Sequence, residues 1–502
     1  MVQTEQLSSK AKNRLFWACF IALTATSFIF MLRAMFISEW AIEFNLSKTQ
    51  MGEILGAGLW PFAITIVLFS LIVDKIGFGK AMLFAFVCHI SSTLLIIFAN
   101  GYWMLYTGAL IMALGNGTVE AVINPVVAAL YPREKTKRLN ILHAGWPGGM
   151  VIGGILALLI GHQLTWQFKM ALIFIPVLLY GLLLIRSKFP VSERVAAGVS
   201  YIDMLKEVGF IGALIIVSLI VLQVGELFGS PVWLNILISF AIAGFYGYKV
   251  KSAGKALFIF LLIIILPLAT TELATDSWLQ DLMSPEMKRL GIEVAWIMIY
   301  VQGLMMVMRF LAGVMIKKMS PLMLLALSSL FTGIGILLLS SNISILIFIA
   351  ATVYGIAKAY LYPTMIGVVG ERFPKGGALT MNLLIGIGLV GSGVLGAPFF
   401  GYIQDTSIEK TLISYDQANQ TQFHQTYVTD PRQCIFGSYY SIDNQKLSQA
   451  SESEKQKIDE MQNFAKKDAL KTIVLLPLFM LLCYIFLIFY FRAKGGYKQI
   501  EL

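Results

Sequence analysis

The sequence predicts an all-α membrane protein that crosses the bilayer many times. Apolar residues make up 58% of its 502 residues and charged residues only 13%, whereas soluble proteins carry about 25% charged residues. The mean hydropathy is high, at +0.77. Apolar runs such as 473–490 recur along the chain, and ~20 apolar residues are the length that crosses a bilayer as a helix. Because helices satisfy their own backbone polar groups in lipid, these runs predict a helical bundle.

We expect about fourteen transmembrane helices. The apolar segments cover residues 15–40, 51–73, 81–99, 102–130, 141–162, 167–186, 208–225, 231–248, 256–280, 293–315, 321–340, 343–366, 378–403 and 470–491. If six helices form each half, the bundles cover residues 15–186 and 256–491. The linker at 187–255 then carries two inserted transmembrane helices.

The basic residues predict the orientation of the chain. If the N-terminus is cytoplasmic, most Lys and Arg residues of the short loops lie on the inner side. The short outer loops then hold only Lys48, Lys169, Lys288 and Arg289. This asymmetry follows the positive-inside rule and predicts an inner or plasma membrane protein with both termini, 1–14 and 492–502, in the cytoplasm. Since the charge of +10 lies mostly in such loops, we expect no nucleic-acid partner.

One predicted outer loop is long, at residues 404–469. It is polar and ends in a charged, helix-like stretch at 448–467. It could be a lid or a partner-binding element, or an insertion without a role in transport. Cys434 lies alone in this loop and the other three cysteines lie in apolar segments, so we expect neither a disulfide framework nor a metal site.

Two segments indicate a weak internal repeat. Residues 115–125 read GNGTVEAVINP and residues 355–363 read GIAKAYLYP. Each is followed by a basic loop and a glycine-rich helix, at 145–154 and 386–396. Many transporters consist of repeated halves with the binding site at their interface.

Glu120 is the strongest candidate for a functional residue. It lies between Asn116 and Asn124 at four-residue spacing, so the three side chains share one helical face. A carboxylate between amides suits hydrogen bonding to a polyol or the exchange of a proton. A structural charge pair is the alternative.

Two basic residues lie inside apolar segments, where a charge is a candidate for function. Lys358 roughly matches Glu120 in the repeat, and we expect it to pair with Glu120 or Glu272, unless it extends to the membrane surface. Arg33 could bind an anionic substrate in bidentate fashion or neutralise Glu120.

Glu272 and Asp276 lie four residues apart on one face. They follow Pro267, which we expect to break the helix. Broken helices in mid-membrane expose backbone groups to solutes and ions. Asp276 could instead lie at the outer surface.

Several further residues are weaker candidates for a solute site. His143 could relay protons and Trp146 could stack on a sugar face, although each could equally serve packing. Asn382 and Gln302 are polar candidates, and we expect a structural role for Arg309 near the cytoplasmic end of its helix.

The sequence contains no GxxxxGK[ST], HExxH or GxSxG string. ATP-driven transport and metalloprotease chemistry therefore have no support. No nucleophile–base set is evident, so we expect no enzyme activity and no cofactor or metal. The proton gradient is the expected source of energy.

The loop SLIVDKIGFGK, with Asp74, Lys75, Gly77 and Lys80, resembles a signature loop of the major facilitator superfamily. In that family the loop latches the cytoplasmic side during alternating access. The resemblance implies this gating role for Asp74, Lys75 and Gly77. The equivalent second loop, GVMIKKMSP, carries Lys317 where the family has an acid.

The segment at 115–125, followed by RLN at 138–140, is similar to the fucose–proton symporter branch of that family. The glutamate of that motif takes part in proton coupling, which the resemblance implies for Glu120. That branch also has an acidic residue in its first helix, where this chain has Ala34. The adjacent Arg33 is similar to the helix 1 arginine of organophosphate antiporters.

Together these features predict a monomeric secondary transporter of a small polar solute, such as a sugar or related metabolite. We expect proton symport by alternating access, through a cavity lined by helices 1, 4, 5, 7, 8, 10 and 11 of the twelve that form the two bundles. An organic-anion or drug antiporter is an alternative. A membrane sensor that binds without transport is another.

Overall fold

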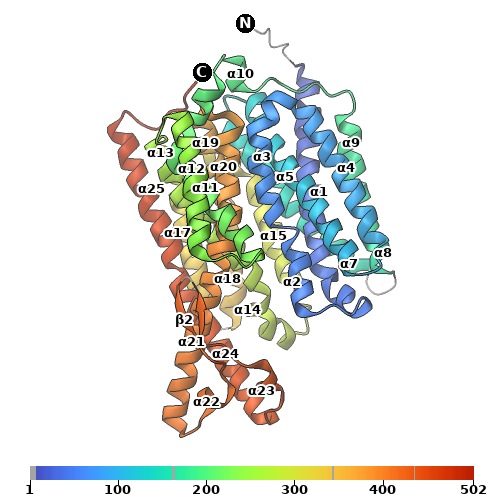
Figure 1. The fold of residues 1–502 in the computed structure, drawn as a ribbon, viewed down its shortest axis with the longest axis vertical. Helices are drawn as coiled ribbons and strands as arrows, with labels where there is room; N and C mark the ends of the chain where they lie inside the picture. The colour runs from blue at the N-terminus through green and yellow to red at the C-terminus, as the bar shows by residue number, and fades with distance from the viewer. Residues whose placement is uncertain (1–6, 161–163, 342–343, 435) are drawn as a thin grey trace.

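The computed structural model describes residues 7–160, 164–341, 344–434 and 436–502, and this part of the chain is helical apart from one short hairpin (Figure 1). The first helices are α1 (Ser9–Glu43), α2 (Lys48–Gly56), α3 (Trp60–Ile76), α4 (Phe78–Ile97), α5 (Tyr102–Leu130), α6 (Lys135–His143), α7 (Gly145–Ile160), α8 (Trp166–Ala171), α9 (Phe174–Leu184) and α10 (Glu193–Ala196). They are followed by α11 (Tyr201–Leu227) and α12 (Val232–Val250).

The second part of the chain begins with α13 (Ala256–Ala269), the π-helical turn η2 (Thr270–Ala274), α14 (Thr275–Arg289), α15 (Ala295–Phe310), α16 (Ala312–Lys318), α17 (Pro321–Leu339), α18 (Ser344–Lys358) and α19 (Leu361–Arg372). It continues with the 3₁₀ turn η3 (Pro374–Gly376), α20 (Gly377–Gly391), the π turn η4 (Ser392–Gly396) and α21 (Ala397–Asn419). The last elements are α22 (Phe423–Tyr427), β1 (Arg432–Cys434), β2 (Gly437–Tyr439), α23 (Asn444–Ser448), α24 (Glu452–Ile473) and α25 (Leu475–Ala493).

The described residues contain twelve helices long and apolar enough to cross a membrane. A thirteenth candidate is formed by α15 and α16, which meet at a bend of 51°. The predicted segment 343–366 is divided between the shorter helices α18 and α19, and its first residue lies outside the described part, as do 1–6 and 161–162. The protein is therefore a multi-pass membrane protein with about twelve spans, and the predicted count of fourteen is not shown.

The spanning helices pack in two groups. In the first group α5 contacts α1, α3 and α4, and α1 also contacts α7 and α9. In the second group α17 contacts α18, α19 and α25, and α13 contacts α20 and α25. The groups meet where α3 lies against α20, α7 against α15 and α6 against α19. We refer to these groups as the first and second halves.

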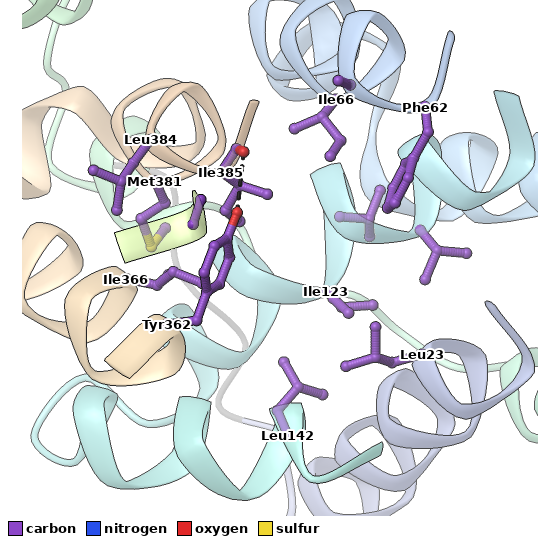
Figure 2. Close-up of a cluster of buried hydrophobic side chains, with 14 of the residues drawn as sticks. Leu23, Phe62, Ile66, Ile123, Leu142, Tyr362, Ile366, Met381, Leu384 and Ile385 are labelled. Carbon is purple, nitrogen blue, oxygen red and sulfur yellow. Dashed lines mark hydrogen bonds between the residues drawn. The ribbon is translucent and has the colours of Figure 1, made fainter. Parts of the chain in front are cut away.

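Between the halves lies a layer of apolar side chains (Figure 2). Leu23 and Ile123 come from the first half, and Ile366 and Leu384 come from the second. All four are fully buried. Tyr362 donates a hydrogen bond to the carbonyl of Ile385 at 3.1 Å, so its hydroxyl is satisfied within this apolar layer.

Helices α11 and α12 form a hairpin beside the halves. Helix α11 packs on α12, α20 and α13. Helix α12 exposes large apolar side chains, including Trp233 and Phe245, as expected of a surface that faces lipid. These two helices correspond to the predicted insertion at 208–225 and 231–248.

The two ends of the molecule differ (Figure 1). The start of α1, the short helix α10 and the C-terminus lie at one end, which we call the terminal end. At the opposite end, the insertion end, α21 to α24 extend beyond the bundle. This extension has its own apolar core, which includes Ile408, Leu412, Tyr427 and Ile458, and its predicted helical stretch at 448–467 lies mostly in α24.

Gly149 allows α1 and α7 to approach closely. A Cβ at this position would lie 2.1 Å from Ser27 Oγ and 2.2 Å from the carbonyl oxygen of Thr24. Gly149→Ala must therefore push the two helices apart, at a cost of about 1–3 kcal/mol. We expect a clearly lower unfolding temperature for this variant, measured on purified protein in detergent.

Gly303→Ala is the matched control for this experiment, because nothing lies within 4 Å of a Cβ at that position of α15. Equal unfolding temperatures for the two alanine variants would contradict the described packing of α1 on α7.

Candidate functional site

A cavity of about 380 Å³ lies between the two halves. Its walls are mainly apolar, and the aromatic side chains come from the first half: Phe30, Trp60, Phe62 and Trp146. The polar side chains that line it are Gln223, Asp276, Gln302 and Ser392. Apolar walls with a few placed polar groups are typical of small-molecule sites.

Trp146, predicted as a possible aromatic face for a solute, lines this cavity. Its ring is nearly parallel to that of Phe62, with an interplanar angle of 11° and 6.4 Å between ring centres. Phe62 and Trp60 belong to α3, a helix that was not expected to line the cavity.

Arg309 lies next to this cavity and donates hydrogen bonds to three segments of the chain. Its Nη2 donates to Glu272 Oε1 at 3.0 Å, its Nε to the carbonyl of Ala359 at 2.7 Å and its Nη1 to the carbonyl of His143 at 2.8 Å. His143 ends α6 and Ala359 follows α18. Since the last carbonyls of a helix lack partners within it, Arg309 caps two helix ends while it neutralises a carboxylate.

Arg309, for which we expected a structural role, also lines the smaller of two cavities between the halves. The side chain is 2% exposed and joins both halves, because His143 belongs to the first half and Glu272 to the second. A buried arginine in an apolar segment is itself a sign of function, and that signal was present in the sequence.

The prediction that the helix breaks at Pro267 is wrong. Helix α13 continues through Pro267 to Ala269, and the π turn η2 follows. Such turns occur frequently at functional sites. Here Glu272 lies within the π turn, and Tyr354 donates to the carbonyl of Thr271 at 3.1 Å.

Lys358 pairs with Asp276, not with Glu120 or Glu272 as predicted. The Lys358 side chain is fully buried and that of Asp276 is 14% exposed, so Asp276 is not at the outer surface. Gln302 donates to the second carboxylate oxygen of Asp276 at 3.1 Å. The π turn shifts the positions that follow it along the helix, so two acids four residues apart take different basic partners.

Glu120 begins a short chain of polar groups. Asn124 donates through Nδ2 to Glu120 Oε2 at 2.9 Å, and His143 Nε2 lies 2.9 Å from Asn124 Oδ1. Because the amide oxygen can only accept, His143 Nε2 carries the proton of this hydrogen bond. A buried carboxylate, a carboxamide and an imidazole are thus aligned.

The carboxylates of Glu120 and Glu272 both line a second, smaller cavity of about 40 Å³ next to the larger one. Glu120, Glu272, Arg309 and His143 line it, together with Tyr362. The guanidinium of Arg309 is directly bonded to Glu272, while Glu120 is bonded to Asn124. Two buried acids and one buried arginine therefore share a site.

Neither of these cavities is lined by the predicted residues Asn116, Arg33 and Asn382, nor by Asn124 and Lys358. Asn116 accepts from His89 at 2.9 Å within the first half, so it does not continue the polar face of Glu120. Arg33 donates to the carbonyl of Ile54 at 2.6 Å and is not paired with Glu120. Asn382 donates to the carbonyl of Ala121 at 2.8 Å and thereby joins α20 to α5.

The predicted gating loop lies at the terminal end. Asp74 accepts from Arg194 Nη2 at 2.6 Å and from its Nε at 3.0 Å. Lys75 lies over the ring of Tyr201, 4.8 Å from its centre, and Gly77 has a φ of +87° that favours glycine. The partner Arg194 was not predicted, because its spacing from the loop in the sequence gives no signal.

Further contacts close the terminal end between the halves. Lys135 donates to Glu193 at 2.6 Å and to the carbonyl of Gly370 at 3.0 Å. Thr136 donates to Glu371 at 2.5 Å. Since Gly370 and Glu371 belong to the second half, these bonds hold the halves together on the side opposite the larger cavity.

Comparison with known proteins identifies the kind of fold. Residues 15–285 match the sequence model described as Major Facilitator Superfamily. A TsgA homolog from Buchnera aphidicola is 27% identical over 186 residues, covering 36% of this chain and 47% of that protein. A gentisate transporter from Corynebacterium glutamicum is 26% identical over 164 residues, covering 32% and 37%. These matches span less than half the length of the relatives.

Two solved structures resemble the fold over nearly the whole chain. The proton:xylose symporter XylE, bound to 6-bromo-6-deoxy-D-glucose, gives a TM-score of 0.63 at 13% identity, covering 99% of this chain and 98% of that one. FucP in the outward conformation gives 0.57 at 14% identity, covering 93% and 98%. At this identity the likeness shows the fold alone.

Arg309→Met tests the central charge pair. The variant leaves Glu272 buried without its partner, which typically costs about 3–5 kcal/mol, so we expect a large fall in unfolding temperature. The double variant Arg309→Met with Glu272→Gln removes both charges and is expected to recover much of that loss. A double variant no more stable than Arg309→Met would contradict the pairing.

Proposed function

Because the chain belongs to the major facilitator superfamily and is thus a secondary transporter rather than an enzyme, we propose that it moves an uncharged polar solute, such as a sugar, together with protons. The proposal rests on the larger cavity, which both halves line. The solute would bind between the aromatic side chains of the first half and the polar side chains of the second.

The charges at the site support an uncharged solute. Arg309 lines the smaller cavity and is bonded to Glu272, and Lys358 is bonded to Asp276, which lines the larger cavity. An anion would have to compete with Glu272 or Asp276 for these cations. Aromatic faces beside amide and carboxylate acceptors suit a ring that carries hydroxyl groups.

Glu120 is the proposed proton-coupling residue. Its bond to Asn124 and the imidazole beyond give a protonatable group with a hydrogen-bonded connection. Arg309, at the same small cavity, is bonded to Glu272. Gain or loss of a proton on Glu120 would change the net charge beside Arg309 and so alter the relative stability of the two conformations.

The conformation supports alternating access. The halves are bonded together at the terminal end, and the larger cavity lies on the other side of the buried charges. With the predicted orientation, this would be an outward-facing form with a closed cytoplasmic gate. Opening that gate would require the bonds of Lys135, Thr136 and Asp74 to break while the halves rotate.

Exchange of organic anions is the second candidate. It is favoured by the partial match to a protein named as a gentisate transporter. In that case Lys358 would leave Asp276 and pair with the anion when the anion binds.

Uptake into proteoliposomes tests these proposals. D-xylose, L-fucose and gentisate would be supplied as labelled solutes, with and without an inward proton gradient, to wild-type protein and Glu120→Gln. We expect gradient-driven accumulation of a sugar by the wild-type protein. Glu120→Gln should lose accumulation and retain sugar exchange, because the neutral amide cannot release a proton.

Ser218→Ala, on α11 and away from both cavities, serves as the control. Sugar accumulation by Glu120→Gln at the wild-type level would rule out Glu120 as the coupling residue. Gentisate flux that does not depend on the proton gradient would favour anion exchange.

A further inference from the structure

Helix α11 belongs to the inserted hairpin, yet one of its side chains reaches the central cavity. Gly212, Ile216, Leu219 and Gln223 follow a spacing of four, three and four residues, which places them on one helical face. The first three are buried. Gln223 is the polar member of this otherwise apolar face and lines the larger cavity.

Small residues of α20 and η4 allow α11 to lie this close. A Cβ at Gly386 would lie 2.8 Å from Val67 of α3 and 3.9 Å from Ile216 of α11. At Gly393 the added Cβ would lie 3.9 Å from Gln223 Oε1. Gly386 is thus where α3 of the first half and α11 both approach α20.

Backbone hydrogen bonds join the N-terminal part of α11 to the start of the second half. Phe210 and Ile211 donate backbone hydrogen bonds to Ser252 and Ala253, at 2.8 and 3.1 Å. Lys255, which directly precedes α13, donates to the carbonyl of Glu207 at 3.1 Å. These bonds predict that α11 moves with the second half.

We propose that Gln223 is a solute-binding residue, and that the inserted helix α11 forms part of the specificity site of the transporter. Among the described residues its carboxamide has no hydrogen-bond partner, and it lines the same cavity as Asp276 and Gln302. A carboxamide both donates and accepts, so it suits a solute hydroxyl. This inference rests on the proposed function.

Gln223→Met tests the inference, because methionine keeps the length of the side chain and removes both hydrogen-bonding groups. Loss of one hydrogen bond to a neutral group corresponds to about a 3- to 10-fold weaker interaction. We expect the KM for D-xylose or L-fucose uptake to rise by about that factor, with a smaller change in kcat. Ser218→Ala should leave KM unchanged. A wild-type KM for Gln223→Met would overturn the inference.

Cysteine labelling separates a binding role from a structural one. Cys19, Cys88 and Cys483 are buried, so Cys434→Ser provides a background of low reactivity. Gln223→Cys and, as a reference, Leu59→Cys, at an exposed side chain that lines the same cavity, would be labelled with a charged methanethiosulfonate in the presence and absence of each sugar. We expect labelling at both positions and protection of both by the transported sugar.

The pattern of protection distinguishes the two possible failures. Protection at position 59 but not at 223 would overturn the role of Gln223 and leave the proposed function intact. If neither sugar is transported and neither position is protected, the proposed sugar transport fails and the inference fails with it.

Discussion

The structure depends on one buried arginine. Arg309 satisfies the carbonyl groups at two helix ends and the carboxylate of Glu272 at the same time. An ion pair this deeply buried contributes little net stability compared with apolar packing, but removal of one partner leaves a charge that lipid and protein cannot solvate. Through these bonds Arg309 links the ends of α6 and α18 to the π turn at Glu272, and thereby joins the two halves.

The second pair, between Lys358 and Asp276, depends on the same geometry. Asp276 lines the larger cavity, where Gln302 donates a hydrogen bond to it. Glu272 lines the smaller cavity. The π turn directs two nearby acids to different cavities. One acid can thus contact solute while the other remains with Arg309, next to Glu120. This arrangement gives a physical route by which solute binding and proton binding influence each other.

The sequence predicted the helical bundle, because apolar length is a local signal, and the charges within apolar segments indicated Glu120, Glu272 and Lys358 as candidates. Partners were predicted poorly. Lys358 pairs with Asp276 because a π turn, which has no clear sequence signature here, changes the helical register. Arg194 and Gln223 were missed since their roles depend on how the linker and the inserted hairpin fold back on the bundle. The membrane orientation and the count of fourteen helices stay predictions.

The most direct test of the account is a count of the protons that purified protein takes up when it binds sugar. Coupling between the two ligands is reciprocal, so addition of L-fucose or D-xylose to wild-type protein in weakly buffered detergent solution should change the pH of the medium. We expect proton uptake by the wild-type protein and none by Glu120→Gln, although the variant still binds the sugar. Sugar binding without any proton uptake by the wild-type protein, or with equal uptake by both proteins, would contradict it.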